Sequence, residues 1–232
     1  MIVAIDGPSA SGKSSTARAV AQALGYAHLD SGALYRGITL VALQELGGII
    51  TGLSAESPQR IVAAAERHGL ALSAKGADFS VRLRGEPVDD LIRGADVTAA
   101  VSAVSAAPVV RNWVNQRLRA QAGSGRSLVV EGRDIGTVVF PHADLKVFLT
   151  ASPETRARRR LLQRGDPVDP DRLREEAAAL VTRDEADRQR LVAPFRMAPD
   201  AVLLDGSDLS LEDQVRRIVD LARARMGSTQ SR

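Results

Sequence analysis

The sequence contains no cysteine, which excludes disulfide bonds, thiolate metal sites and a cysteine nucleophile. Aromatic residues make up only 3% of its 232 residues, and it has no tail rich in lysine and arginine, two features that argue against polynucleotide binding. No apolar run approaches the roughly 18 residues that a membrane helix needs. The opening MIVAID is too short for a signal peptide and lacks a charged start. We therefore expect a cytoplasmic protein with neither a membrane nor a nucleic-acid partner.

Lysine is scarce as well. Lys13, Lys75 and Lys146 are the only three, and the other 28 basic residues are arginines. The net charge is +3, and the basic residues cluster in two interior segments rather than at the ends. Because a guanidinium group binds phosphate with two parallel hydrogen bonds, this distribution favours small phosphorylated ligands. A codon bias toward arginine is the alternative explanation.

Strands and helices are expected to alternate along most of the chain, which is typical of an α/β fold with a central parallel sheet covered on both faces. Short apolar runs predict strands at 2–5, 26–30, 127–134, 145–151 and 201–205. Helical spacing of apolar residues predicts helices at 13–24, 33–46, 54–66, 96–122, 153–164, 170–190 and 211–226. Two alternating runs around a glycine-containing turn predict a small β unit within about 66–95.

The segment GPSASGKS matches G-x-x-x-x-G-K-[ST], the phosphate-binding P-loop. Gly7 and Gly12 let the backbone wrap so that its N–H groups point at phosphate oxygens, and the following helix adds its positive N-terminal end. Lys13 would reach the outer phosphates, and the hydroxyl of Ser14 or Ser15 would ligate Mg²⁺. A serine-rich turn that caps a helix needs neither both glycines nor the lysine. The motif therefore predicts a site for a nucleoside triphosphate.

Two large classes of protein share this loop, namely nucleotide hydrolases and kinases of small molecules. Guanine-specific switches carry N-K-x-D, which is missing from this sequence. Several arginine-containing motifs suit a second anionic substrate instead, so the sequence favours a kinase.

Four further motifs are candidates for binding that second substrate and for closing the site. LDSGALYRG begins at Leu29, and VVEGRDIGTVVFP places three charged residues and two glycines at the end of an apolar strand. TRARRR and RDEADRQR each place charged residues at helical spacing on one helix face. Each motif has a plainer explanation: a helix N-cap with a surface arginine, a turn with a local ion pair, a solvated basic face, and a salt-bridged surface helix. The three histidines lack metal-ligand spacing, and we expect His28 and Trp113 to be packing residues.

Taken together, IDGPSASGKSS, LDSGALYR, EGRDIGTVVFP and RDEADRQRLVAP resemble the bacterial-type cytidylate kinases in order and approximate spacing, over residues 2–222. The resemblance implies a single P-loop kinase domain over 1–232 with three layers around the parallel sheet. Its core would comprise 1–65 and 96–226, its inserted nucleotide-binding β subdomain 66–95, and its lid 152–168. The implied reaction is Mg²⁺-dependent transfer of the γ-phosphoryl group of ATP to CMP or dCMP. The sequence leaves the oligomeric state open, and a monomer is the default expectation.

The resemblance also implies the roles of individual residues. ATP would be held by Gly7, Pro8, Ser9, Ala10, Ser11, Gly12, Lys13, Ser14 and Ser15, and by the lid residues Arg156, Arg159 and Arg160. CMP would be held by Ser31, Gly32, Tyr35, Arg36, Ser102, Arg111, Arg133, Asp134, Arg183, Asp187 and Arg190. Within these sets, Ser102, Arg111 and Asp134 would read cytosine, and Arg183 and Asp187 would hold the ribose. The catalytic set would be Lys13, Arg133, Arg159 and Arg190. The family often has glycine where Ser14 stands, so either serine remains a candidate metal ligand.

Three other functions remain open at this point. A kinase for another acceptor, such as shikimate or a different nucleoside monophosphate, shares the loop but neither EGRDIGTVVFP nor the β insert. A nucleic-acid-binding P-loop protein would show steep salt dependence in polynucleotide binding. A regulatory ATP sensor would bind ATP without turnover.

We predict that Asp134→Ala erodes the preference for CMP over UMP. Cytosine presents an N4 amino donor to a carboxylate, whereas uracil presents the O4 acceptor there, and breaking one such buried contact costs about 1–3 kcal/mol. Steady-state kinetics with both acceptors measure the preference. An unchanged ratio would remove Asp134 from the base pocket.

Overall fold

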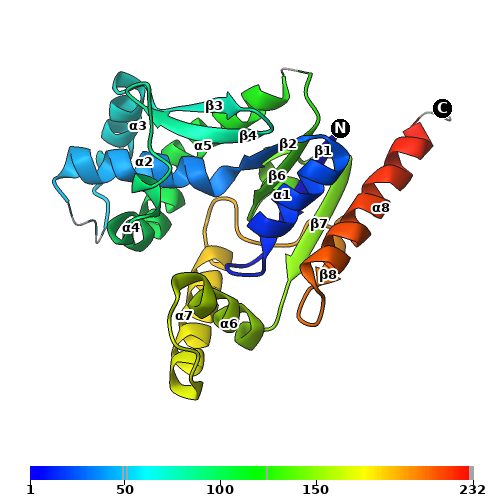
Figure 1. Ribbon diagram of the computed structural model, residues 1–232. Coiled ribbons are helices and arrows are strands. Elements are labelled where there is room, and N and C mark those ends of the chain that lie inside the picture. The colour runs from blue at the N-terminus through cyan, green and yellow to red at the C-terminus, as the bar shows by residue number, and fades with distance from the viewer. Residues whose placement is uncertain (49, 51, 124, 230–232) are drawn as a thin grey trace. The chain divides into compact units, whose positions relative to one another are not determined.

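The computed structural model describes residues 1–48, 50, 52–123 and 125–229. The chain divides into two compact units (Figure 1). The first comprises 1–28 and the chain from 127 onward, and the second comprises 29–126. β2 (Ala27–Asp30) runs from one unit into the next. The second unit contains the segment 66–95 that the sequence suggested as an insert, and extends well beyond it on both sides.

The first unit alternates strands and helices. In chain order its elements are β1 (Ile2–Asp6), α1 (Lys13–Leu24), β6 (Leu128–Gly132), the π-helical segment η2 (Ile135–Val139), β7 (Leu145–Thr150), α6 (Pro153–Arg164), α7 (Pro170–Arg188), β8 (Val202–Asp205) and α8 (Leu211–Thr229). Strands β6, β1, β7 and β8 pair in that order, and every pair is parallel. The predicted α/β fold with a mostly parallel sheet is confirmed.

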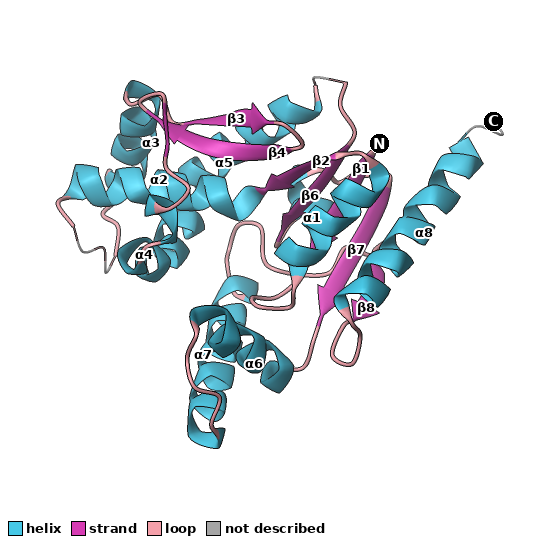
Figure 2. Ribbon diagram, viewed as in Figure 1, coloured by secondary structure: helices cyan, strands magenta, loops and turns pink. Residues whose placement is uncertain are grey.

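The sheet register places the chemistry at one edge. Ile5 of β1 lies opposite Glu131 of β6 on one side and Val147 of β7 on the other. The carboxyl ends of these parallel strands therefore meet at the same edge, where ligands bind in such folds. Figure 2 shows the chain running from the tip of the β7 arrow through a short loop into α6.

The core of the first unit lies between the strands and two helices. α1 contributes Ala17 and Val20, and α8 contributes Ile218 and Ala222, to one cluster of buried side chains. The strands contribute their own fully buried residues to the same cluster, so that α1 and α8 lie side by side along the strands (Figure 1). Near-continuous apolar strands of this kind require such a cover.

The second unit contains most of the helices that the sequence predicted before residue 126. Its elements are α2 (Ser31–Leu46), α3 (Ser57–Arg67), β3 (Ala71–Lys75), β4 (Asp78–Leu83), β5 (Glu86–Pro87), the 3₁₀ segment η1 (Leu91–Arg93), α4 (Ala95–Ala106) and α5 (Pro108–Ala122). β3 and β4 are antiparallel, with Lys75 opposite Asp78, which confirms the predicted hairpin. Trp113 is buried as expected, and its indole N–H donates to Glu66.

One local prediction was wrong, and two helices have slightly different bounds from those expected. The single helix expected over 96–122 is two helices, because Pro108 cannot continue the first one and holds Ala107 in an extended conformation. The helix expected over 170–190 is confirmed as α7 and ends two residues earlier, at Arg188. The helix expected over 33–46 begins two residues earlier, at Ser31, because the Asp30 carboxylate caps it by accepting from Ala33 N.

A buried carboxylate joins β1 to the segment that follows β6. Asp6 is the last residue of β1 and is only 5% exposed. Its two oxygens accept hydrogen bonds from Ile135 N at 2.8 Å and Gly136 N at 2.7 Å, which are the first residues of η2. Burial raises the pKa of Asp6 to about 6, even though these two N–H groups favour the charged form.

This raised pKa makes Asp6 a cost to stability at neutral pH. The pKa of the folded protein lies above the ordinary value of 3.8, so the stabilising contribution of this group is complete below about pH 4 and is lost as pH rises through 6. At about 1.4 kcal/mol per pH unit between the two values, the ionised group costs on the order of 3 kcal/mol at pH 7.

We predict that wild type gains stability relative to Asp6→Asn as pH falls from 7.5 to 4. The free energy of unfolding, measured by urea denaturation of both proteins, should differ by about 3 kcal/mol more in favour of wild type at the lower pH. The variant is its own control, since every other titrating group contributes to both curves. Curves that stay parallel would contradict the assignment.

Candidate active site

The phosphate loop of residues 7–15 connects the end of β1 to the start of α1, which confirms the strand–loop–helix context that the motif requires. Its backbone adopts left-handed conformations at Ala10, with φ 59°, and at Gly12, with φ 97°. Gly7 has no room for a side chain, because a Cβ atom there would lie 2.0 Å from the carbonyl oxygen of Leu149 on β7. The loop therefore lies tightly against β7, and its curvature forms a backbone cradle for an anion at the N-terminus of α1.

Lys13 bends back over this loop. Its Nζ donates to the carbonyl oxygen of Pro8 at 2.6 Å. Desolvation, and then repulsion from the guanidinium of Arg133, lower the pKa of Lys13 to about 8, while Glu131 and Asp6 act in the opposite direction. A phosphate bound in the loop would place a further anion beside Lys13, in addition to Glu131 and Asp6.

The next residue of the loop is connected to the buried end of β6. Ser14 Oγ donates to Glu131 Oε2 at 2.7 Å, and the other oxygen of Glu131 lies 3.0 Å from His28 Nε2. Glu131 and His28 are both buried. Because a carboxylate has no hydrogen to donate, the Ser14 hydroxyl is the donor of this pair and its oxygen lone pairs are directed elsewhere. His28 is packed, as expected, and it also holds Glu131 in place.

Two of the three α6 arginines that the sequence assigned to ATP lie against the phosphate loop. Arg156 is buried, and its Nη1 donates to the carbonyl oxygen of Ser9 at 3.2 Å. Arg159 donates to the carbonyl oxygens of Ser11 at 2.9 Å and Gly206 at 2.7 Å. Arg160 lies on the same helix, half-buried, and burial lowers its pKa. The alternative of a solvated basic face on α6 is therefore wrong for Arg156 and Arg159.

A second buried carboxylate, that of Asp184, pairs with the arginines around this loop. Asp184 of α7 is 1% exposed, and its Oδ1 accepts from Arg133 Nη1 at 2.9 Å and Ser9 N at 3.3 Å. Its Oδ2 accepts from Arg156 Nη1. Burial alone would raise the pKa of Asp184, but the hydrogen bonds and charges of the two arginines hold it below the ordinary value.

Asp187 extends this arrangement by one helical turn. Its Oδ2 lies 2.8 Å from Arg133 Nη1, and its Oδ1 pairs with Arg190. The backbone carbonyl of Asp187 accepts from Phe195 N, and the Phe195 ring lies under the Arg133 guanidinium at 5.2 Å. Arg190 reaches Asp187 although it lies beyond the end of α7. Arg183 lies on α7 one turn before Asp187, as the spacing predicted.

Other predicted acceptor residues lie in the second unit. Tyr35 and Arg36 are on α2, Ser102 is on α4 and Arg111 is on α5. The Arg111 guanidinium lies 5.2 Å from the centre of the Tyr35 ring, and its Nη1 donates to Ser105 O at 3.0 Å. Ser105 Oγ in turn donates to Ser102 O.

Arg36 sits beside η1 and α4. Its Nη1 donates to Thr98 Oγ1 at 2.8 Å and Ile92 O at 3.4 Å. Arg36 and the group of Tyr35, Arg111 and Ser102 are therefore held within this unit by its own contacts, while Ser31 and Gly32 form the first turn of α2.

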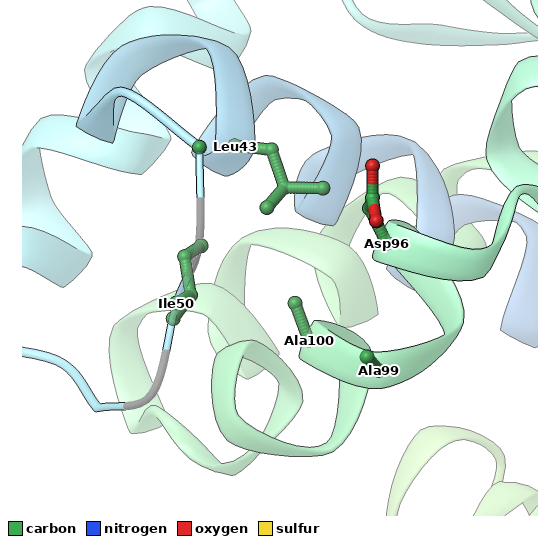
Figure 3. Close-up of a pocket in the computed structure, with 6 residues that line it drawn as sticks. Leu43, Ile50, Asp96, Ala99 and Ala100 are labelled. Carbon is green, nitrogen blue, oxygen red and sulfur yellow. The ribbon is translucent and has the colours of Figure 1, made fainter.

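The second unit also contains a pocket of about 200 Å³ between the C-terminal end of α2 and α4 (Figure 3). Leu43, Ile50, Ala99 and Ala100 line it with apolar atoms, and Asp96 is the only charged residue among the described residues that line it. A carboxylate on an apolar wall repels a phosphate. None of the predicted site residues lines this pocket, and its chemistry does not suit a nucleotide.

Sequence reasoning missed three contributors to the site. Asp6 is the last residue of β1, and Glu131 lies one residue before the end of β6, and both are buried. A charged residue at the end of an apolar strand is the sequence signal that could have identified them. Asp184 stands inside the motif RDEADRQR, but helical spacing alone did not distinguish it from Asp187. Within the described ranges, no helix is long and apolar enough to cross a membrane, and no three His, Asp or Glu side chains gather as metal ligands.

Known proteins resemble this chain closely in sequence and more distantly in structure. The chain is 42% identical to the cytidylate kinase of Geobacillus kaustophilus over 228 residues, 97% of each chain. It is 43% identical to the cytidylate kinase of Rhodococcus jostii over 99% of this chain and 98% of that one. An uncharacterized protein of Eubacterium ventriosum has a similar fold, with a TM-score of 0.52 at 11% identity over 95% of this chain and 97% of that one. The model of the cytidylate kinase family matches residues 3–224. With its phosphate loop and its acceptor-side motifs, the chain belongs to the cytidylate kinase family.

Proposed function

We propose that the protein transfers the γ-phosphoryl group of ATP to CMP or dCMP. The observation that carries the proposal is the cluster of Arg133, Arg156 and Asp184 against the phosphate loop, in a chain of this family. The loop suits a triphosphate, and the arginines next to it suit the phosphate of a second nucleotide. We further propose that it acts as a monomer in the cytoplasm.

In this reaction the protein positions charges rather than breaking bonds itself. A phosphate oxygen of CMP bonds to the γ-phosphorus while the bond from that phosphorus to the bridging oxygen breaks, and ADP leaves. The attacking phosphate is nearly dianionic at neutral pH, so it needs no general base. Lys13 and the loop N–H groups would hold the outer phosphates of ATP, and Arg133 and Arg190 would hold the phosphate of CMP.

The remaining predicted residues would orient the two nucleotides. Arg156, Arg159 and Arg160 would lie over the triphosphate as part of a lid at 152–168. Asp134, Ser102 and Arg111 would read cytosine, and Arg183 and Asp187 would hold the ribose. The segment 66–95 would belong to the part that closes over CMP, so that water is excluded from the transferred group.

We propose that Mg²⁺ would be held through Ser14 rather than Ser15. Ser14 gives its hydrogen to Glu131, so the oxygen lone pairs remain available, and oxygen atoms are the ligands that Mg²⁺ prefers. Asp6 and Glu131 add negative charge at the same strand ends. When bound, Mg²⁺ would neutralise charge on the phosphates of ATP.

We expect turnover with CMP and dCMP, weak turnover with UMP, and none with AMP, GMP or shikimate. A coupled assay of ADP release with ATP and Mg²⁺ measures each acceptor. Lys13→Ala should lose about 100-fold or more in kcat, because it removes a positive charge from the transferring phosphate, with an unchanged circular dichroism spectrum.

Turnover with a different acceptor would keep the kinase and discard the base pocket. The absence of acceptor-dependent turnover would favour the ATP-sensing or nucleic-acid-binding alternatives. Near-normal turnover of the Lys13→Ala variant would overturn the role of the loop.

We predict that Ser14→Ala and Ser15→Ala behave differently. Ser14→Ala should raise the Mg²⁺ concentration for half-maximal activity by about tenfold, as for the loss of a group that holds a metal. Ser15→Ala is the matched control, since it removes the same hydroxyl one residue later, and should stay within about twofold of wild type. Equal effects of the two substitutions, or a larger effect at Ser15, would reverse the assignment.

A further inference from the structure

Asp184 occupies a position that the roles of the other site residues do not account for. It belongs to none of the sets expected to touch ATP or CMP, yet it is almost fully buried among residues that do. Its neighbours come from three separate segments: the phosphate loop, the turn after β6, and α6. We define the Asp184 cluster as Asp184, Ser9, Arg133 and Arg156.

Each member of the cluster contacts at least two of the others. Arg133 donates to Asp184 Oδ1 through Nη1 and to Ser9 Oγ through Nη2 at 2.6 Å. Arg156 donates to Asp184 Oδ2 and to Ser9 O through Nη1. Ser9 N donates to Asp184 Oδ1. The position of either guanidinium group therefore depends on the same carboxylate and the same loop residue.

Electrostatics explain why a carboxylate is required at this point. Two guanidinium groups that converge on one loop residue repel each other, and a partly buried setting screens that repulsion less than water does. The ionised Asp184 lies between them and accepts from both. Removing one partner of such a buried set leaves a charge without compensation, which is far more costly than losing a surface ion pair.

We propose that Asp184 is a positioning residue that couples the ATP site to the CMP site. This inference rests on the proposed function, in which Ser9 and Arg156 serve ATP and Arg133 serves CMP. Binding of ATP fixes Ser9 and Arg156, which fixes Asp184 and thereby Arg133. Binding of CMP does the same in reverse, so each nucleotide tightens the binding of the other, as linkage requires.

The test measures this coupling directly in the full-length protein. The affinity for the non-hydrolysable analogue AMPPNP with Mg²⁺ is determined by calorimetry, without CMP and with saturating CMP. For wild type we expect CMP to strengthen AMPPNP binding by about fivefold or more. For Asp184→Asn we expect a ratio close to one, together with a loss of about 100-fold in kcat, because small displacements of positioned groups carry such costs.

A control variant separates coupling from general damage. Asp200→Asn removes the carboxylate that pairs with Lys146 at 2.9 Å, an ion pair of the same unit that includes no member of the cluster. It should keep the coupling ratio of wild type. Ser9→Ala removes only the hydroxyl that accepts from Arg133 and leaves no buried charge, so it should lower the ratio without unfolding the protein. Should Asp184→Asn fail to fold, Ser9→Ala decides the question alone.

The outcomes distinguish this inference from the proposed function. A wild-type protein that does not phosphorylate CMP would refute the proposed function. An active wild type without coupling, or Asp184→Asn with a ratio within twofold of wild type, would refute the role of Asp184 and leave the reaction in place. An unchanged ratio in Ser9→Ala, where it decides alone, would refute it equally.

Discussion

The ion pairs of Asp184 with Arg133 and Arg156 hold together the parts of the first unit that carry its chemistry. The phosphate loop, the turn after β6 and α6 are far apart in the sequence, and no backbone hydrogen bond of a sheet or helix could join all three. A carboxylate at the start of the last turn of α7 does so because its two oxygens accept from several directions at once. Such a set is stable only while every charge keeps its partner, so the positions of its members depend on one another.

The site also contains two carboxylates that are buried at the ends of strands. β1 ends in Asp6 and β6 carries Glu131 next to its end, and both are buried although charged groups are usually excluded from such positions. Hydrogen bonds from the first two N–H groups of η2 offset part of the desolvation of Asp6, and the hydrogen bond from Ser14 offsets part of the desolvation of Glu131. Because the pKa of Asp6 is still raised, the hydrogen bonds from η2 compensate for its desolvation only in part. Burial of these carboxylates lowers the stability of the fold, and in return they hold in place the loop and the turn that would bind the nucleotides.

The sequence was sufficient to predict the elements and most of the loop chemistry, because both depend on local patterns. The phosphate loop needs a glycine at 7 and at 12 for geometric reasons that a motif records. The break at Pro108 was equally local and could have been predicted, since proline ends a helix whatever surrounds it. Asp184 and His28 were different, because their roles depend on partners in other elements, such as Arg133, Arg156 and Glu131, and no spacing within one helix or strand reveals those.

The scarcity of lysine has a physical counterpart in the site. Arg133 reaches Asp184, Asp187 and Ser9 at once from two nitrogens of one planar group, with Nη1 facing both carboxylates and Nη2 facing the serine. Lys13 differs from Arg133, because its ammonium donates to a neutral carbonyl oxygen, that of Pro8, rather than to a carboxylate. Burial, and then the neighbouring Arg133 guanidinium, lower its pKa to about 8. Under the proposed function, a compact charge on a flexible stem would suit contact with a phosphoryl group that changes its position, whereas the planar arginines would suit the phosphates that stay in place.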